Sequence, residues 1–237
     1  MQLIFVRHGE PLRMDYGISE MGKEELKLLS EFLMKNYEVD SIISATSQRA
    51  KESAEVINSY FNKNVIYYDW LSEFKYRISC DDYKNDFPWE FPPEYWINND
   101  ELLDYKTVFE TSFFLESDVP KKSYEVWTGL DKIIKDFGYE RIGNMYKVNN
   151  PNKSVIIIVS HFATIAIILA HLLNVSVLVT LNMLFMAPSS YTVFSTEEIK
   201  DGSAIFRCLE MGSTKHLYEH NDLKSEYGRQ DEIKGKE

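Results

Sequence analysis

The chain has 237 residues, enough for one large α/β domain or two small ones, and its 44% of hydrophobic residues can form a packed core. A formal net charge of -11 argues against a nucleic-acid interface, which needs a basic face, but allows a locally positive pocket for a small anion. Cys80 and Cys208 form neither a metal-ligand spacing nor a disulfide framework. Because the chain also starts inside its first apolar run, we expect a cytoplasmic protein without a signal peptide.

The first third of the chain alternates strand and helix patterns. Its apolar runs are short and partly β-branched, as in buried strands, and its helical segments carry apolar residues at helical spacing. Ser19 and Thr46 are the expected N-caps. The expected elements are a strand over 2–6, a helix over 19–36, a strand over 41–44, a helix after Thr46 and a strand over 65–68. This order predicts a parallel sheet covered by helices.

Regular patterning lapses over residues 75–123, which are rich in aromatic and acidic side chains, so we expect a cap or lid inserted between strands. Trp89 and Trp96 are expected to pack inside this cap. The later expected elements are a helix over 124–137, a hairpin over 141–148, a strand over 155–159, a helix over 163–173 and strands over 190–195 and 203–209. The charged residues 222–237 predict a flexible tail, leaving a single domain over 1–221.

One apolar stretch, residues 155–173, is long enough to cross a bilayer. Its first part is β-branched and its second is rich in helix formers, and Ser160 and His161 fall at the junction, where a membrane helix tolerates polar residues least. A buried strand followed by a buried helix explains the pattern, so we expect no membrane span.

Polar side chains follow the expected strands at comparable places. Arg7 and His8 follow the first strand, His161 follows a late one, Arg49 lies in the first turns of the helix after strand two, and Glu73 comes just after strand three. Ligands of parallel α/β sheets bind beyond the carboxyl ends of the strands, where these groups would meet. Two guanidiniums and two imidazoles there would form a pocket for one phosphoryl group.

Three motifs stand in this order along the chain: Arg7-His8-Gly9-Glu10, Gln48-Arg49-Ala50 and Ser160-His161. Together they resemble the histidine phosphatase superfamily, which includes the cofactor-dependent phosphoglycerate mutases. The resemblance covers roughly residues 2–74 and 123–210. It implies a phosphoglycerate mutase-like α/β fold of three layers, α/β/α, with a largely parallel central sheet, to which this chain adds an aromatic-rich cap.

The resemblance also implies roles for individual residues. His8 would be the nucleophile that forms a phosphohistidine, and Arg7, Arg49 and His161 would bind the phosphoryl oxygens. Glu73 stands at the place of the family's acid/base residue, which protonates the leaving oxygen and then takes a proton from water.

That acid/base role needs a carboxyl with a raised pKa. The neighbours Trp70, Leu71 and Phe74 could desolvate Glu73 and raise its pKa.

The sequence departs from the family pattern in three places. Met14, Asp15 and Tyr16 stand where many relatives have a phosphate-binding asparagine and a Gly-x-x-Asp stretch, and Phe162 replaces the usual glycine after His161. The insert also lacks the adjacent arginines with which mutases hold bisphosphoglycerate, and this absence favours hydrolysis.

These features predict a metal-independent phosphatase that needs no cofactor and hydrolyses a small phosphorylated metabolite. The alternatives are a cofactor-dependent phosphoglycerate mutase and a non-catalytic module that binds a phosphorylated ligand. Among the other histidines, we expect His171 in the core and His216 and His220 at the surface, although His216 could close over the pocket. The sequence identifies neither the substrate nor the oligomeric state.

Overall fold

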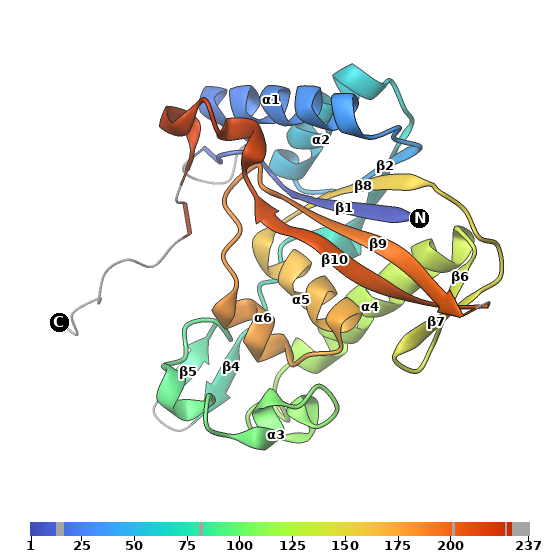
Figure 1. The fold of residues 1–237 in the computed structure, drawn as a ribbon. Coiled ribbons are helices and arrows are strands. Elements are labelled where there is room, and N and C mark those ends of the chain that lie inside the picture. The colour runs from blue at the N-terminus through green and yellow to red at the C-terminus, as the bar shows by residue number, and fades with distance from the viewer. Residues whose placement is uncertain (13–16, 81–82, 201, 226, 229–237) are drawn as a thin grey trace.

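The computed structural model describes residues 1–12, 17–80, 83–200, 202–225, 227 and 228 (Figure 1). The expectations for residues 14–16, for Asp201 in the late turn and for 229–237 of the tail lie outside the described residues.

The centre of the molecule is an eight-stranded sheet with the order β3-β2-β8-β1-β9-β10-β7-β6. Its strands are β1 (Gln2–Arg7), β2 (Ser41–Ala45), β3 (Val65–Tyr68), β6 (Tyr139–Ile142), β7 (Met145–Val148), β8 (Val155–Ser160), β9 (Tyr191–Lys200) and β10 (Ser203–Ser213). The four strands β3, β2, β8 and β1 are parallel to one another, while β9, β10, β7 and β6 extend the sheet through antiparallel pairs. The predicted fold class is thereby confirmed, with the parallel part at the core of the sheet.

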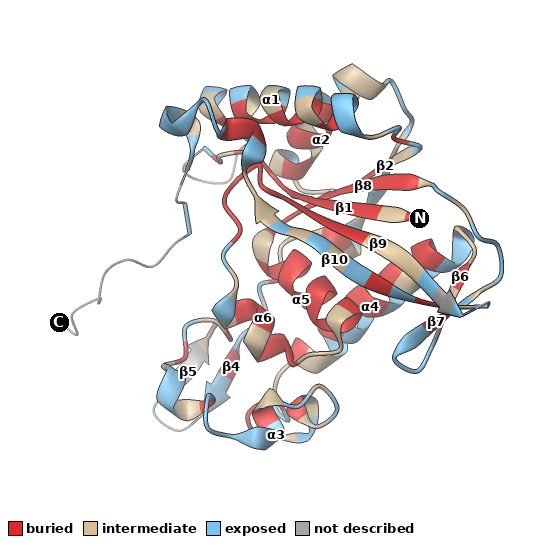
Figure 2. Cartoon of the chain, in the orientation of Figure 1, coloured by how far each residue is buried: buried red, intermediate tan, exposed pale blue. Residues whose placement is uncertain are grey.

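Six helices accompany the sheet in the described part of the chain: α1 (Glu20–Asn36), α2 (Gln48–Phe61), α3 (Asp100–Leu103), α4 (Val119–Asp136), α5 (Phe162–Leu173) and α6 (Val177–Met183). Helices α1 and α2 lie on one side of the sheet and α4 and α5 on the other (Figure 1). Strands β1 and β8 are therefore covered on both faces, and Figure 2 shows them almost wholly buried. Burial on both faces explains why their sequences are continuous apolar runs rather than alternating ones.

The predicted helix N-caps had different outcomes. Ser19 caps α1 as predicted, because its Oγ accepts the N–H of Gly22 at 3.0 Å. The prediction for Thr46 is wrong: the N-cap of α2 is Ser47, and the Thr46 hydroxyl instead donates to the Asp69 carboxylate at 2.6 Å.

Several elements are longer than predicted. Helix α4 begins at Val119 rather than at 124, because Pro120 is compatible with the first turn of a helix, where its missing N–H has no partner to lose. Strands β9 and β10 both extend beyond their predicted ends, and α6 was not predicted. None of the described helices is long and apolar enough to cross a membrane, and the apolar stretch divides into β8 and α5 as expected.

The insert forms a small unit beside α5 and α6 (Figure 1), and its buried aromatic residues belong to the same hydrophobic core as the sheet and the main helices. It contains the two-stranded sheet β4 (Ile78–Cys80) and β5 (Tyr83–Asp86), and helix α3. Trp96 is buried, and Trp89 stacks on Phe87 with ring centroids 4.7 Å apart, which agrees with packing roles for both. The predicted domain boundaries remain a prediction.

Hydrogen bonds attach the insert to the helices beneath it. The Leu102 carbonyl accepts from Ser176 at 2.5 Å, the Pro88 carbonyl accepts from Asn182 at 3.2 Å, and the Tyr105 hydroxyl lies 3.2 Å from His171 Nδ1. His171 is the satisfied core histidine that the sequence predicts, since its Nε2 also lies 2.9 Å from Asp131.

A Gly22→Ala variant tests how closely the loop after β1 packs on α1. Alanine inside a helix gains about 1 kcal/mol over glycine, but a Cβ at Gly22 would lie 2.6 Å from the backbone N and O of Glu10. We expect the clash to prevail and the free energy of unfolding, measured in urea, to fall by about 1–3 kcal/mol. Glu31→Ala, at an exposed position of the same helix, should change it by less than about 0.5 kcal/mol. A Gly22→Ala protein more stable than the wild type would contradict this close packing.

Candidate active site

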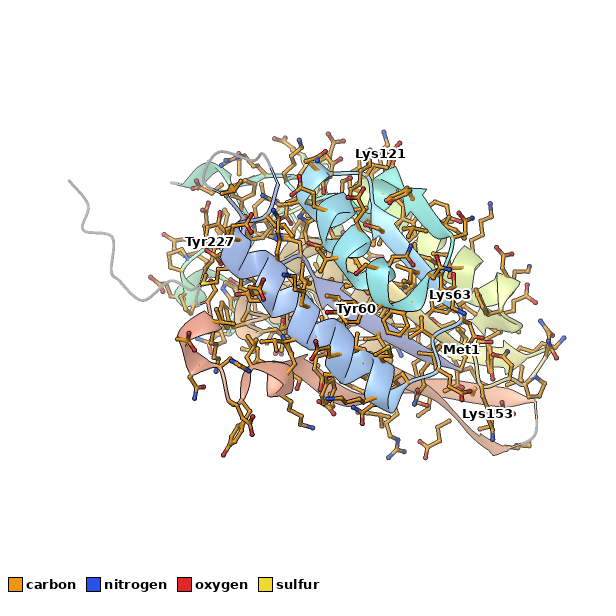
Figure 3. All side chains as sticks on the ribbon, turned by 90° about the horizontal axis from the view of Figure 1, so that it is seen from above. Met1, Tyr60, Lys63, Lys121, Lys153 and Tyr227 are labelled. Atoms are coloured by element: carbon orange, nitrogen blue, oxygen red, sulfur yellow. The ribbon has the colours of Figure 1, made fainter. Side chains whose placement is uncertain are left out.

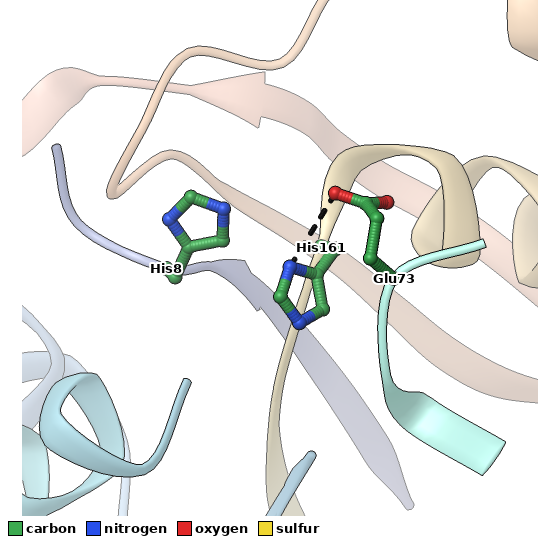
Figure 4. Close-up of side chains that lie close together, drawn as sticks. All are labelled: His8, Glu73 and His161. Carbon is green, nitrogen blue, oxygen red and sulfur yellow. Dashed lines mark ion pairs between the residues drawn. The ribbon is translucent and has the colours of Figure 1, made fainter. Parts of the chain in front are cut away.

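The two candidate histidines lie together because two parallel strands end side by side. Arg7 of β1 pairs with Ser160 of β8, so the next residue of each strand, His8 and His161, leaves the sheet at the same level. Their ring centroids are 5.0 Å apart. Both side chains are buried, and Figure 4 shows them beside Glu73.

Arg49 and Glu73 complete the group. Arg49 Nε lies 3.2 Å from Nδ1 of His161, and Arg49 Nη2 donates to Oε2 of Glu73 at 3.2 Å. The same oxygen of Glu73 lies 3.4 Å from His161 Nδ1, the contact that is dashed in Figure 4. The structure therefore brings together all the predicted site residues around the carboxyl ends of the parallel strands.

Glu73 is placed by hydrogen bonds that attach its loop to β8 and α5. The Ser160 hydroxyl donates to the carbonyl of Leu71 at 2.6 Å, and the Thr164 hydroxyl donates to the carbonyl of Ser72 at 2.7 Å. Both donors flank His161 in sequence. The position of the carboxylate is thus fixed relative to the imidazole by the same segment that carries the imidazole.

His8 is held as a neutral imidazole with one defined tautomer. Its Nδ1 lies 2.8 Å from the carbonyl oxygen of Gly9, which can only accept, so Nδ1 carries the proton. Burial first, and then the nearby His161, Arg7 and Arg49, lower the pKa of His8 well below its usual value. At neutral pH the lone pair of Nε2 is therefore available for attack on an electrophile.

Arg7 is a buried cation with one unsatisfied donor. Only 6% of the residue is exposed, and burial lowers the pKa of its guanidinium to about 10, which still leaves it charged at neutral pH. Its Nη1 donates to the carbonyls of Met186 at 2.5 Å and Tyr227 at 3.1 Å. Its Nε is buried and has no partner among the described residues. A buried donor without an acceptor is costly, and an anion in the site would satisfy it.

The expectation of a raised pKa for Glu73 is wrong for the ligand-free protein. Burial alone would raise it, as predicted, but the hydrogen bond and charge of His161 and the charges of Arg49 and Arg7 outweigh burial and lower the pKa of Glu73. The sequence identified the desolvating neighbours but not the contacts that act against them. Glu73 Oε1 has no partner among the described residues.

Three further residues support the site and were missed from the sequence. The Ser47 hydroxyl lies 2.7 Å from Nε2 of His161, and the Ser53 hydroxyl accepts the N–H of Gly9 at 3.1 Å. Glu25, which is fully buried in α1, accepts the N–H of Glu10 at 3.0 Å, and burial raises its pKa to about 7. A serine at a helix N-cap is a readable signal for Ser47, but helical periodicity gave no reason to select the other two.

The surface position expected for His216 is wrong. The residue is 8% exposed, its Nε2 lies 3.3 Å from the Ser189 hydroxyl, and burial lowers its pKa to about 4. Ser189 in turn donates its N–H to the carbonyl of His8 at 3.0 Å. His216 thus belongs to the packing behind the His8 loop. His220 is exposed as expected.

The donor set suits an oxyanion better than a metal ion. Ligand atoms of His8, Glu73 and His161 lie within 4.8 Å of one another, which is compatible with a metal site. However, the guanidiniums of Arg7 and Arg49 act on the same groups, and a metal cation would be repelled by them. Helix α5 begins at Phe162, directly after His161, and the N-terminus of a helix also favours an anion.

A cavity of about 550 Å³ lies beside Glu73. Its lining includes the aromatic side chains of Trp70 and Tyr76 and the cations Lys75 and Lys122. The carboxylate therefore borders both the cluster around His161 and a space large enough for an organic group.

Comparison with known proteins bears on the family resemblance. The family model of the histidine phosphatase superfamily (branch 1) matches residues 3–101, and this match confirms the resemblance that the motifs indicate. Residues 3–101 contain Arg7, His8, Arg49 and Glu73, while His161 lies outside them. No curated protein matches the sequence.

Several solved structures that resemble the chain are phosphatases by name. A mutant phosphoserine phosphatase from Entamoeba histolytica, in complex with phosphoserine, is 17% identical with a TM-score of 0.57, over 91% of this chain and 98% of that chain. A mycobacterial glucosyl-3-phosphoglycerate phosphatase is 19% identical (TM-score 0.55, 90% and 98% covered), and an alpha-ribazole phosphatase from Shigella flexneri is 15% identical (TM-score 0.56, 90% and 97% covered). At these identities the likeness establishes the phosphoglycerate mutase-like fold.

The pKa of Glu73 should respond to an anion in the site. In the free protein it should lie below the usual glutamate value, and inorganic phosphate should raise it because the added negative charge offsets Arg7 and Arg49. Carboxyl ¹³C NMR titrations with and without phosphate measure this shift. Glu140, whose pKa is lowered by Lys135 on the surface, is the internal control and should not respond. A Glu73 pKa that phosphate leaves unchanged would place the anion elsewhere.

Proposed function

We propose that the protein is a metal-independent phosphatase that hydrolyses a small phosphomonoester through a phosphohistidine at His8. The observation that carries this proposal is a neutral, buried imidazole with a free Nε2 beside two guanidiniums and a second imidazole. A nucleophile without charge and a cationic surround are what attack on a phosphate dianion requires.

The first step forms the phosphohistidine. Nε2 of His8 attacks phosphorus as the bond to the ester oxygen breaks, and Arg7, Arg49 and His161 stabilise the charge on the non-bridging oxygens. Glu73 gives its proton to the leaving oxygen, which departs as an alcohol. The carboxyl must therefore be protonated in the complex, and the bound dianion promotes this by offsetting the cations that lower the pKa of Glu73 in the free protein.

The second step returns the enzyme to its starting state. Water attacks phosphorus, the Glu73 carboxylate takes the proton of that water, and the bond from phosphorus to Nε2 breaks. His8 leaves as a neutral imidazole whose Nδ1–H still donates to the Gly9 carbonyl. The products are inorganic phosphate and a protonated Glu73, ready for the next ester.

The leaving group would occupy the cavity beside Glu73. Trp70 and Tyr76 in its lining provide apolar contact for a small organic group, and Lys75 supplies a cation, while Lys122 is paired with Glu125 at 2.8 Å. The similar structures support this class, since their names give phosphoserine, glucosyl-3-phosphoglycerate and alpha-ribazole phosphatases. Hydrolysis is favoured over mutase-type transfer because the insert lacks the adjacent arginines of mutases. The cytoplasmic location stays a prediction.

Replacing the nucleophile should abolish turnover. We expect His8→Ala to lower the rate of hydrolysis of phosphorylated metabolites by more than about 10³-fold, and the wild type, incubated with ³²P-labelled ester, to carry label that is lost in acid and kept in alkali. Excess EDTA in every assay should leave the wild-type rate unchanged. His220→Ala replaces an exposed histidine and should behave as wild type. An active His8→Ala protein, or loss of activity in EDTA, would refute the mechanism.

The fall in kcat/KM on removing the acid should be larger for esters whose leaving oxygen needs a proton. For Glu73→Gln we expect kcat/KM to fall by about 10²-fold or more with alkyl phosphates, whose leaving oxygen needs a proton, and by less than about tenfold with 4-nitrophenyl phosphate. Glu125→Gln, in the lining of the same cavity, should affect both substrates alike. Equal losses for both esters in Glu73→Gln would argue against Glu73 as the acid.

A further inference from the structure

The C-terminal segment reaches the candidate site from the far end of the sequence. Ser225 donates its hydroxyl to the carboxylate of Glu10, two residues after His8. The Tyr227 carbonyl accepts from Arg7 Nη1 at 3.1 Å, and the Tyr227 ring lies 5.8 Å from the Arg7 guanidinium carbon. Figure 3 shows Tyr227 at the end of the molecule where α1 begins.

These contacts use one particular part of the Arg7 guanidinium. Nη1 carries two hydrogens, and the carbonyls of Met186 and Tyr227 accept one each. Nε, in contrast, is buried without a partner among the described residues. The edge formed by Nε and Nη2 is the remaining fork of donors, and such a fork matches two oxygens of a phosphoryl group.

Gly228 fits the segment closely against this guanidinium. Its φ of +88° is a conformation that side chains rarely adopt, and a Cβ added there would lie 3.3 Å from Nη2 of Arg7. Two separate features, a hydrogen-bonded carbonyl and a glycine at close approach, thus bring the same short segment against the same buried cation.

We propose that Ser225, Tyr227 and Gly228 form a positioning segment for Arg7, which holds Nη1 so that the Nε–Nη2 edge is presented to the phosphoryl oxygens of the substrate. Met186 supplies one acceptor from the body of the fold, and Tyr227 supplies the second, so that rotation of the guanidinium about its long axis is restricted. The bond from Ser225 to Glu10 anchors the segment to the loop that carries His8. This inference rests on the proposed function, because it assigns the tail a part in binding the same phosphoryl group.

A single substitution can move the segment without touching the residues of the site. We expect Gly228→Ala to displace the Tyr227 carbonyl from Arg7 and to weaken binding of inorganic phosphate, measured by calorimetry on the full-length protein, by about tenfold, the loss typical of one hydrogen bond to a charged group. The melting temperature should stay unchanged. Gly143→Ala is the matched control, since Gly143 also has a positive φ (+59°) but open space around it, and should bind phosphate as the wild type does.

The hydrogen bond from Ser225 to Glu10 gives a second, independent test, in which one variant should weaken phosphate binding and a conservative one should restore it. Ser225→Ala removes the hydroxyl that binds Glu10 and should weaken phosphate binding in the same direction, whereas Ser225→Thr keeps a hydroxyl and should restore it. In steady-state assays we expect KM to rise and kcat to fall, because Arg7 binds the phosphoryl oxygens both in the bound ester and in the transition state.

The outcomes separate this inference from the function on which it rests. Unchanged phosphate affinity in both Gly228→Ala and Ser225→Ala would overturn the positioning role while leaving the phosphatase intact. Tighter phosphate binding would also overturn it, because the Tyr227 carbonyl would then compete with phosphate for Arg7. A wild-type protein that binds phosphate but forms no phosphohistidine would refute the proposed function alone, and one that binds no phosphate would refute both.

Discussion

The pairing of β1 with β8 is the interaction on which the rest of the site depends. It is parallel and in register, with Arg7 opposite Ser160, so the residues that follow are level with each other at the edge of the sheet. A strand slipped by one residue would turn His8 or His161 to the other face. Both strands are covered by helices on both sides and are almost wholly buried.

The second constraint is the concentration of positive charge at that edge. The guanidiniums of Arg7 and Arg49 converge beside two imidazoles in a place with little solvent, and the fold offsets their charge with a carboxylate at Glu73 and with carbonyl oxygens on Arg7. The offset is incomplete, since Arg7 Nε stays unsatisfied. The ligand-free site therefore keeps mutual repulsion between its cations and an unpaired donor, and a bound dianion would reduce the repulsion and accept from that donor.

Much of this could be predicted from the sequence, because the signals were local. An apolar run followed at once by Arg7 and His8, or by Ser160 and His161, indicates a strand end with polar chemistry, and parallel topology then brings such ends together. The N-cap at Ser19 was readable for the same reason. The N-cap of α2 was not, because two hydroxyl residues stand in sequence and both hydroxyls bond to tertiary partners, Asp69 and His161, rather than to the N-terminus of the helix.

What could not be predicted depends on contacts between distant segments. The sign of the Glu73 pKa shift is the balance of burial against three cationic or hydrogen-bonding neighbours, and composition around Glu73 shows only the first of these. The approach of Tyr227 to Arg7 joins residues at opposite ends of the chain, and a charged, apolar-poor segment gave no sign of it.

The insert between β3 and α4 has a consequence for how such a protein can diversify. Its aromatic residues bury one another, and it is joined to α5 and α6 through contacts such as those of Leu102 and Tyr105. The contacts that join Arg49, Glu73, His8 and His161 involve none of these aromatic residues. Under the proposed function, a lineage can therefore lengthen, shorten or exchange this unit and recognise a new metabolite while the proposed phosphoryl-transfer chemistry stays the same.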